Sequence, residues 1–220
     1  MPTTPHDNAC RGKLILASSS PRRREILQAA GFEFEVVATS VREEQLPGES
    51  PETFVCRLAT EKAAAALDRI AHPCAAPILG ADTVVVLGNE MLGKPVSAED
   101  AQRMLRMLSG REHRVLTGLC LLSPPPDWPS PLSELRKEVQ FASTLVQFAE
   151  LTEEEIEAYV ASGEPFDKAG GYAIQGLASK YVEEIQGCYF NVVGLPVSLL
   201  YQMLQRLHSD TAMESAQKQR

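Results

Sequence analysis

Short apolar runs alternate with amphipathic stretches along the first third of the chain. The runs at 14–17 and 34–38 have the length of short strands. Between them, Ser20 suits the N-cap of a helix and Pro21 its first position, and the helix should end near Gly31. Its predicted apolar stripe consists of Ile26, Leu27 and Ala30. The pattern therefore predicts a strand–helix–strand start.

A longer helix, at about 51–70, follows a polar loop at 41–52. Apolar residues at helical spacing mark its buried face: Phe54, Val55, Leu58, Ala59 and Ala63. The nearly continuous apolar run at 78–87 then predicts a central strand, and the Gly88-Asn89 pair predicts a tight hairpin into 90–93.

The middle of the chain has strong helix-boundary signals and two long strand patterns. Ser97 and Asp100 form a capping pair for a helix that Gly110 ends, with Met104, Leu105 and Leu108 facing inward. Strands are predicted at 114–122 and 138–148. The proline-rich segment between them cannot be strand interior, because proline removes ladder donors, and predicts a long hairpin loop.

The last part begins with a capping box, Thr152 with Glu155, for a helix that ends at Gly163. The glycine-rich segment 166–176 is too irregular for a helix. A strand at about 181–185, a short strand or turn to Gly194 and a helix from Pro196 to about Leu207 follow, and the tail from Ser209 is expected to fray.

Together these elements predict a mixed α/β fold, because helices and strands alternate early whereas antiparallel strand pairs fill the middle. An elongated central sheet flanked by helices, with two lobes around a cleft, is the expected architecture. We expect a single domain at 13–208, with flexible tails at 1–12 and 209–220.

Composition limits the classes of partner. The 29 acidic and 21 basic residues give a formal charge of −8, so nucleic acid or an anionic membrane would meet net repulsion. The five cysteines are scattered, with no C-x-x-C pair, which fits a reducing cytoplasm better than a disulfide framework. We expect a cytoplasmic protein that binds neither membrane nor nucleic acid, and whose anionic ligand is small.

The segment SSSPRRR (18–24) places three arginines where a helix begins, although the positive end of a helix dipole favours acidic residues. An anion bound at the helix N-terminus would resolve this conflict. Consecutive helical residues fan around the axis, so we expect Arg22 to be the principal contact and Arg23 the second, with Ser18 in the adjoining turn and Arg24 in solvent. The alternative is a solvated basic face.

Asp82 is the second anomaly, because a carboxylate within an apolar strand is costly unless it is paired, hydrogen-bonded or bound to a metal. It is the best candidate for a catalytic residue, and a structural aspartate is the alternative. Thr83 should point to the opposite side of a regular strand, unless a bulge at Gly80 changes the alternation.

The remaining charged candidates have a predicted role only if they lie near a shared anion. Lys62 and Lys94 would then bind phosphate as point charges. Glu43, or Glu44 beside it, could join Asp82 in holding a hard divalent cation through oxygen ligands. Taken alone, these residues are typical of a solvated surface.

The segment DKAGGYAIQG (167–176) has a backbone that can approach a planar ligand closely. Lys168 would add charge there, and Gln175 could donate to and accept from a base edge. A structural glycine turn is the alternative.

These segments, in this order, resemble the Maf family of nucleoside triphosphate pyrophosphatases. The matching stretches are ASSSPRRREIL, RLATEKA, LGADTVVVL, LGKP, LSGREHRVLTG, YVASGEPFDKAGGYAIQG and NVVGLP, between about residues 14 and 207. The resemblance implies a nucleotide-binding cleft and hydrolysis of a nucleoside triphosphate to the monophosphate and pyrophosphate with a divalent cation, Mg²⁺, Mn²⁺ or Co²⁺. A homodimer is the candidate assembly.

Residue roles carry over from these motifs. The aspartate of GADT, Asp82, resembles the catalytic acid that activates water or holds the metal, and the loop acid aligns best with Glu43. Contacts with the triphosphate are implied for Arg22, Lys62 and Lys94.

Within the family, DKAGGY followed by IQG resembles the branch that acts on dTTP and UTP. Arg22, Thr83 and Gln175 resemble its specificity positions. Ala173 stands where glycine is common, and the 123–135 loop looks long, so both bear on substrate preference. The alternatives are a pyrophosphatase for 7-methyl-GTP or another non-standard nucleotide, and a nucleotide-binding regulator of cell division.

Overall fold

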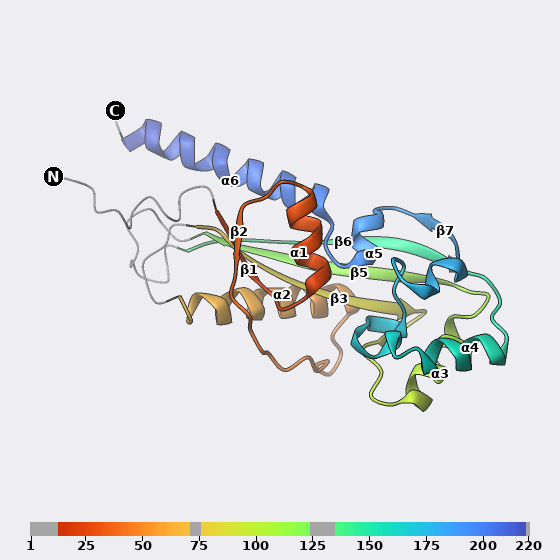
Figure 1. Cartoon of the computed structure of the whole chain (residues 1–220). Helices are drawn as coiled ribbons and strands as arrows, with labels where there is room; N and C mark the ends of the chain where they lie inside the picture. Colours follow the sequence, from red (N-terminus) through yellow and green to blue (C-terminus); the bar gives the residue numbers. More distant parts are fainter. Residues whose placement is uncertain (1–12, 71–75, 124–134, 219–220) are drawn as a thin grey trace.

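A long, twisted sheet forms the centre of the molecule, and helices cover both of its faces (Figure 1). The computed structural model describes residues 13–70, 76–123 and 135–218. The mixed α/β class and the elongated sheet predicted from the sequence are confirmed. The 1–12 tail and most of the proline-rich loop lie outside the described residues.

The sheet combines a small parallel part with a larger antiparallel part. Its order is β2-β1-β3-β5-β6-β7, and β4 pairs with β3. β1 pairs in parallel with β2 and β3, whereas β4, β5, β6 and β7 join through antiparallel pairs. The strands span β1 Leu14–Ala17, β2 Phe34–Val36, β3 Ile78–Leu87, β4 Glu90–Leu92, β5 Glu112–Ser123, β6 Arg136–Phe148 and β7 Val182–Gln186.

One face of the sheet carries helix α2 (Pro51–Leu67). Two glycines of the sheet allow its close approach: a Cβ on Gly80 would lie 1.9 Å from the carbonyl oxygen of Ala59, and one on Gly118 would lie 2.3 Å from that of Val55. The predicted apolar face of α2 is buried, which confirms that part of the sequence analysis.

The other face carries α1 (Pro21–Ala29), α5 (Tyr189–Val193) and α6 (Val197–Lys218), seen on the far side of the sheet from α2 in Figure 1. Ile26 and Leu27 of α1 are buried as predicted, but Ala30 is exposed because the helix ends before it. Leu200 and Met203 of α6 pack against Leu79 and neighbouring strand residues.

The remaining helices gather at one end of the sheet. α3 (Ala98–Leu108) and α4 (Glu153–Ala161) have the predicted caps: Ser97 accepts from the amide of Asp100, and Thr152 with Glu155 forms a capping box. The 3₁₀ turns at Glu164–Asp167, Ala169–Gly171 and Leu177–Tyr181 carry the glycine-rich segment past this end.

One predicted element type and two predicted helix ends were wrong. The stretch before Gly194 is helix α5 rather than a short strand or turn, because buried hydrogen bonds donated by the Asn191 side chain fix it. The final helix continues to Lys218 instead of stopping near Leu207, so 209–218 is helical. Helix α2 ends at Leu67, before Ile70.

Candidate active site

The sheet has a gap along one edge of β3. β1 pairs with β3 only as far as Gly80, and the β4 pairing begins at Val85. The edge of β3 between these points faces a cavity of about 770 Å³. The cavity lies where the parallel strand β1 ends and α1 begins, and the carboxyl ends of parallel strands are a common place for ligand binding in α/β folds.

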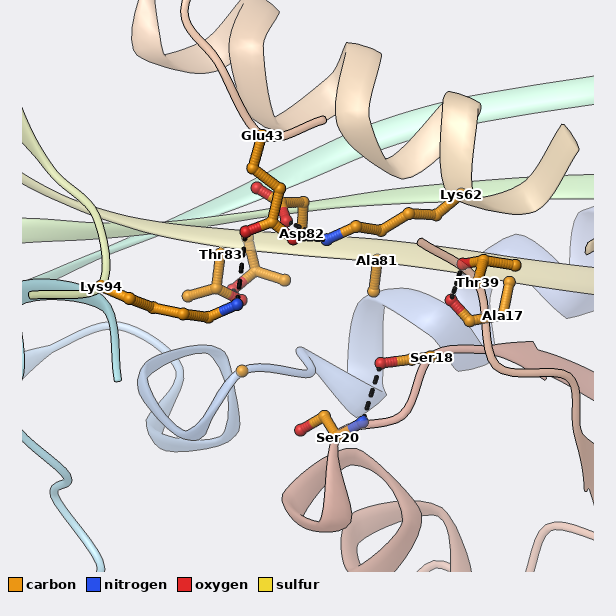
Figure 2. A network of polar contacts seen from close by, with 12 residues as sticks. Ala17, Ser18, Ser20, Thr39, Glu43, Lys62, Ala81, Asp82, Thr83 and Lys94 are labelled. Carbon is orange, nitrogen blue, oxygen red and sulfur yellow. Dashed lines mark hydrogen bonds and ion pairs between the residues drawn. The ribbon is translucent and has the colours of Figure 1, made fainter. Parts of the chain in front are cut away.

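Asp82 projects from β3 toward α2, where Lys62 reaches it (Figure 2). Lys62 Nζ donates to Asp82 Oδ1 over 2.6 Å, and both residues are under 10% exposed. Alternation along a regular strand sends Thr83 to the opposite face, as predicted.

Glu43 adds a second carboxylate to this group. Its Oε1 accepts from Lys62 over 2.6 Å, and its Oε2 accepts from Lys94 over 3.3 Å (Figure 2). The neighbouring Glu44 is exposed and pairs with Arg42. Of the two acids left open by the sequence, Glu43 is therefore the one in the cavity.

The two carboxylates differ in proton affinity. Burial raises the pKa of Asp82 above its ordinary value, although Lys62 opposes this effect. Burial also acts to raise the pKa of Glu43, but hydrogen bonds and charges from Lys62 and Lys94 outweigh it, so that pKa is lowered. Asp82 is thus the more basic carboxylate of the pair.

Arg23, which the sequence analysis placed second to Arg22, is the buried arginine of the three. Its Nε donates to Gly194 O, its Nη1 to Ser18 Oγ and Ala81 O, and its Nη2 to Thr83 Oγ1, over 2.8–3.1 Å. Burial lowers its pKa. Bonds to residues that the structure describes use four of the five guanidinium N–H groups in this way, which leaves one for a ligand.

Arg22 lines the cavity from its outer side. Its Nη1 lies 3.3 Å from Asp167 Oδ2, and Lys168 Nζ contacts the other oxygen of that carboxylate. Asp167 therefore holds two cations at the mouth of the cavity. Arg24 is exposed and is not among the lining residues, as predicted.

The N-terminus of α1 also faces the cavity. Ser20 is the N-cap but makes no side-chain cap, and the first turn has no acidic residue. Ser18 Oγ instead accepts from the amide of Ser20 over 3.2 Å (Figure 2). Amide groups at this helix end are suited to an anion.

Nearly every site residue predicted from the sequence lines this one cavity: Ser18, Arg22, Arg23, Glu43, Lys62, Asp82, Thr83, Lys94 and Lys168. Gln175 differs. It is exposed and is not among the lining residues, so its role stays a prediction.

Sequence reasoning missed several lining residues. Asp167 and the half-exposed ring of Phe166 precede Lys168 in the same segment. Tyr172 also lines the cavity and belongs to the same core cluster as Val85. The run FDK could have drawn attention to Asp167, because a carboxylate beside a predicted phosphate-binding lysine needs explanation.

Within the described ranges, no group of three or more His, Cys, Asp and Glu side chains is arranged to hold a metal ion. The same residues include no helix long and apolar enough to cross a bilayer.

The chain matches the family model described as Maf-like protein over residues 13–207. A protein from Geobacillus sp. (strain WCH70) named dTTP/UTP pyrophosphatase is 47% identical over 195 residues, which cover 89% of this chain and 98% of that protein. A protein of the same name from Geobacter sulfurreducens is 48% identical, with 90% and 97% coverage. The Ham1 protein of Staphylococcus aureus is 14% identical with a TM-score of 0.48, covering 88% of this chain and 98% of that one, and the family assignment does not depend on it.

Proposed function

Because the chain belongs to the Maf-like family, we propose that it is a nucleoside triphosphate pyrophosphatase that hydrolyses dTTP and UTP. The products are the nucleoside monophosphate and pyrophosphate, so the bond broken joins the α and β phosphates. The names of the relatives from Geobacillus and Geobacter support this choice of substrate.

One observation carries the proposal: a buried aspartate of raised pKa lies in a cavity lined by several cations. A triphosphate brings about four negative charges, and phosphoryl transfer depends mainly on positioning and on stabilising charge. The cations that line the cavity are Arg22, Arg23, Lys62, Lys94 and Lys168.

Asp82 is the proposed general base. Its Oδ1 accepts from Lys62, and no donor in the described part of the chain bonds its Oδ2. That oxygen is free to accept a proton from an attacking water, and a carboxylate with a raised pKa is the better base. Lys62 holds the carboxylate in place and adds positive charge beside the phosphate that is attacked.

The residues present fit a divalent cation. Asp82 and Glu43 both direct oxygens at the Lys62 ammonium, so this part of the cavity already gathers carboxylate oxygens around positive charge. Mg²⁺ is commonly held by one or two carboxylates together with substrate phosphates. Asp82 and Glu43 would hold Mg²⁺, Mn²⁺ or Co²⁺, which lowers the pKa of a bound water and neutralises phosphate charge.

Lining residues that lie away from Asp82 suit the nucleoside. Phe166 presents a partly exposed ring that can stack on a base, and Thr83 offers a hydroxyl on the face of β3 away from Asp82. Gln175 remains the proposed contact with a base edge.

The proposed setting is the cytoplasm, where nucleoside triphosphates are available and scattered free cysteines stay reduced. The proposed partner is the small nucleotide itself, and the homodimer remains the candidate assembly.

A panel of nucleotides with pyrophosphate detection tests the substrate. We expect dTTP and UTP to be cleaved fastest in the presence of Mg²⁺, Mn²⁺ or Co²⁺. Faster cleavage of 7-methyl-GTP or inosine triphosphate would overturn the choice of substrate, and binding of nucleotide without turnover would favour a regulator.

The Asp82→Asn variant tests the mechanism. It keeps the shape of the side chain but removes the base, so kcat should fall by at least about a hundredfold while dTTP still binds. Unchanged turnover would exclude Asp82 as the base.

A further inference from the structure

A chain of buried hydrogen bonds runs from the cavity across the sheet to helix α5. It starts at the guanidinium of Arg23, passes through the hydroxyls of Thr83 and Thr117, and ends at the backbone carbonyl oxygen of Asn191. Its three bonds measure 3.0, 3.0 and 3.1 Å. Thr117 and Asn191 are both fully buried, and neither lines the cavity.

The far end of this chain is firmly anchored. Asn191 Nδ2 donates to the carbonyl of Val115 over 2.8 Å and to Thr144 Oγ1 over 3.0 Å. A carbonyl only accepts, so the contact with Val115 fixes the orientation of the Asn191 amide. The carbonyl of Asn191 also accepts from the amide of Gly194, whose own carbonyl accepts from Arg23.

The partners determine the direction of every bond. The backbone carbonyl of Asn191 can only accept a hydrogen bond, so the Thr117 hydroxyl donates its single hydrogen to it. The 3.0 Å contact between the two hydroxyls then requires Thr83 to donate to Thr117. Thr83 also accepts from Arg23. The Thr83 hydroxyl therefore faces the cavity with a lone pair and no hydrogen.

Because the Thr83 hydroxyl can only accept from the cavity, it determines which group of the nucleotide can bind next to it. A hydrogen-bond acceptor at this oxygen attracts an N–H and repels another lone pair, such as that of a ring nitrogen without hydrogen. Thymine and uracil carry an imide N3–H, and cytosine has a lone pair at the same ring position when its sugar and phosphates are held alike.

We propose that Thr117, anchored by Asn191, is a positioning residue for base selectivity, because it directs the Thr83 hydroxyl to accept the imide N–H of thymine or uracil. This inference rests on the proposed function and adds a selectivity device to it. Thr117 acts through Thr83 and does not touch the nucleotide.

The Thr117→Val variant tests the inference, since valine has the same shape and cannot accept a hydrogen bond. The Thr83 hydrogen then turns toward the cavity and can donate to cytosine N3. We expect the ratio of kcat/KM for dTTP to that for dCTP to fall by at least about fivefold, mainly through KM. Thr117→Ser keeps the hydroxyl and should restore the ratio.

Thr60→Val is the matched control. The Thr60 hydroxyl donates to the carbonyl of Cys56 within α2, far from this chain of bonds, so the loss of one threonine hydroxyl there should leave the ratio unchanged. Thermal unfolding of each variant checks that it is folded. If Thr117→Val does not fold, Thr117→Ala removes the same hydroxyl and gives the same comparison.

The outcomes separate the two proposals. A wild-type protein that releases pyrophosphate from neither dTTP nor UTP overturns the proposed function. A wild-type protein that prefers dTTP to dCTP, with an unchanged ratio in Thr117→Val, overturns the inference alone. If the ratio of kcat/KM for dTTP to that for dCTP also fell in Thr60→Val, the change would reflect a general loss of stability. That result would overturn the inference about Thr117 as well.

Discussion

The three consecutive arginines at the start of α1 have three different environments. Arg23 is buried and ties β1, β3 and the Gly194 turn together, Arg22 lies at the cavity mouth, and Arg24 is in solvent. The 100° step between helical residues explains the separation. It also supplies a matched pair of variants for testing the contact with phosphate.

Arg22→Ala should weaken the binding of dTTP about tenfold, because it removes a charge-assisted contact and leaves Asp167 with one cation fewer. Arg24→Ala should have no measurable effect. Calorimetric titration with dTTP and with thymidine provides the comparison. An equal loss of affinity for both ligands in Arg22→Ala would contradict the phosphate role.

His113 gives the fold a specific pH dependence. Its Nε2 lies 2.8 Å from the hydroxyl of Tyr172, its ring packs edge-on against Phe148, and burial lowers its pKa to about 4. The unfolded chain takes up a proton near pH 6.5, whereas the folded chain does so only near pH 4. Stability contributed by the neutral ring is therefore complete above pH 6.5 and is lost as the pH falls toward 4.

As the pH falls from 6 to 4.5, the free energy of unfolding should decrease more steeply in the wild type than in the His113→Gln variant. The difference between the two slopes should be about 1 kcal/mol per pH unit. Glutamine can keep a hydrogen bond with Tyr172 and does not titrate. Urea unfolding across this range measures the difference. Parallel pH profiles for the two proteins would show that His113 stays neutral in both states or is protonated in both.

At the scale of elements, the contact of α2 with β3 places Lys62 beside Asp82, the proposed general base. The backbone of α2 packs directly on Gly80, and the same helix carries Lys62 to Asp82, two residues further along β3. A side chain at position 80 would clash with the backbone of α2, which cannot change its rotamer as a side chain can.

Gly80→Ala should therefore lower the free energy of unfolding by about 3 kcal/mol and reduce turnover, because α2 has to shift away from β3. Gly93→Ala is the control for stability, since a Cβ there meets nothing within 4 Å. Denaturant unfolding compares the two. A stable Gly80→Ala protein with full activity would show that the helix contact is not required.

Elements whose signals are local could be predicted from the sequence. The Ser97 and Thr152 caps and the apolar run of β3 depend on neighbouring residues, and Asp82 stood out because it interrupts such a run. Helix α5 could not be predicted, because Asn191 is held by strand residues distant in sequence.

The same distinction applies to the site. Their charges and the family resemblance grouped Lys62, Glu43 and Asp82, and these residues do lie in contact. The burial of Arg23, in contrast, depends on where Gly194 and Thr83 lie in space. The exposed position of Gln175 depends on the path of a glycine-rich segment, and its sequence says little about that path.

At the scale of the molecule, the cavity lies where the cores of the two ends of the sheet meet. Tyr172 and Val85 belong to the core around α3 and α4, Val193 to the core near α1, and Ala17 and Phe54 to two clusters under α2. A ligand in the cavity therefore bridges parts that otherwise pack separately.

The Asp82→Asn variant with Mg²⁺ and dTTP at about a hundred times its dissociation constant should gain about 2.7 kcal/mol in stability. For a chain of this size the melting temperature should rise by about 5–10 °C. Thermal denaturation with thymidine in place of dTTP is the control. At the same concentration as dTTP, an equal rise with thymidine would mean that the triphosphate adds nothing to the affinity.

The gap in the sheet between β1 and β4 also sets a length scale. The open edge of β3 runs over Ala81–Val84, and four residues of extended chain span roughly 13 Å. β1 closes the slot at one end and β4 closes it at the other. An extended ligand that lies along this edge takes the place of the missing strand segment, so β1 and β4 limit its length to that of a small molecule.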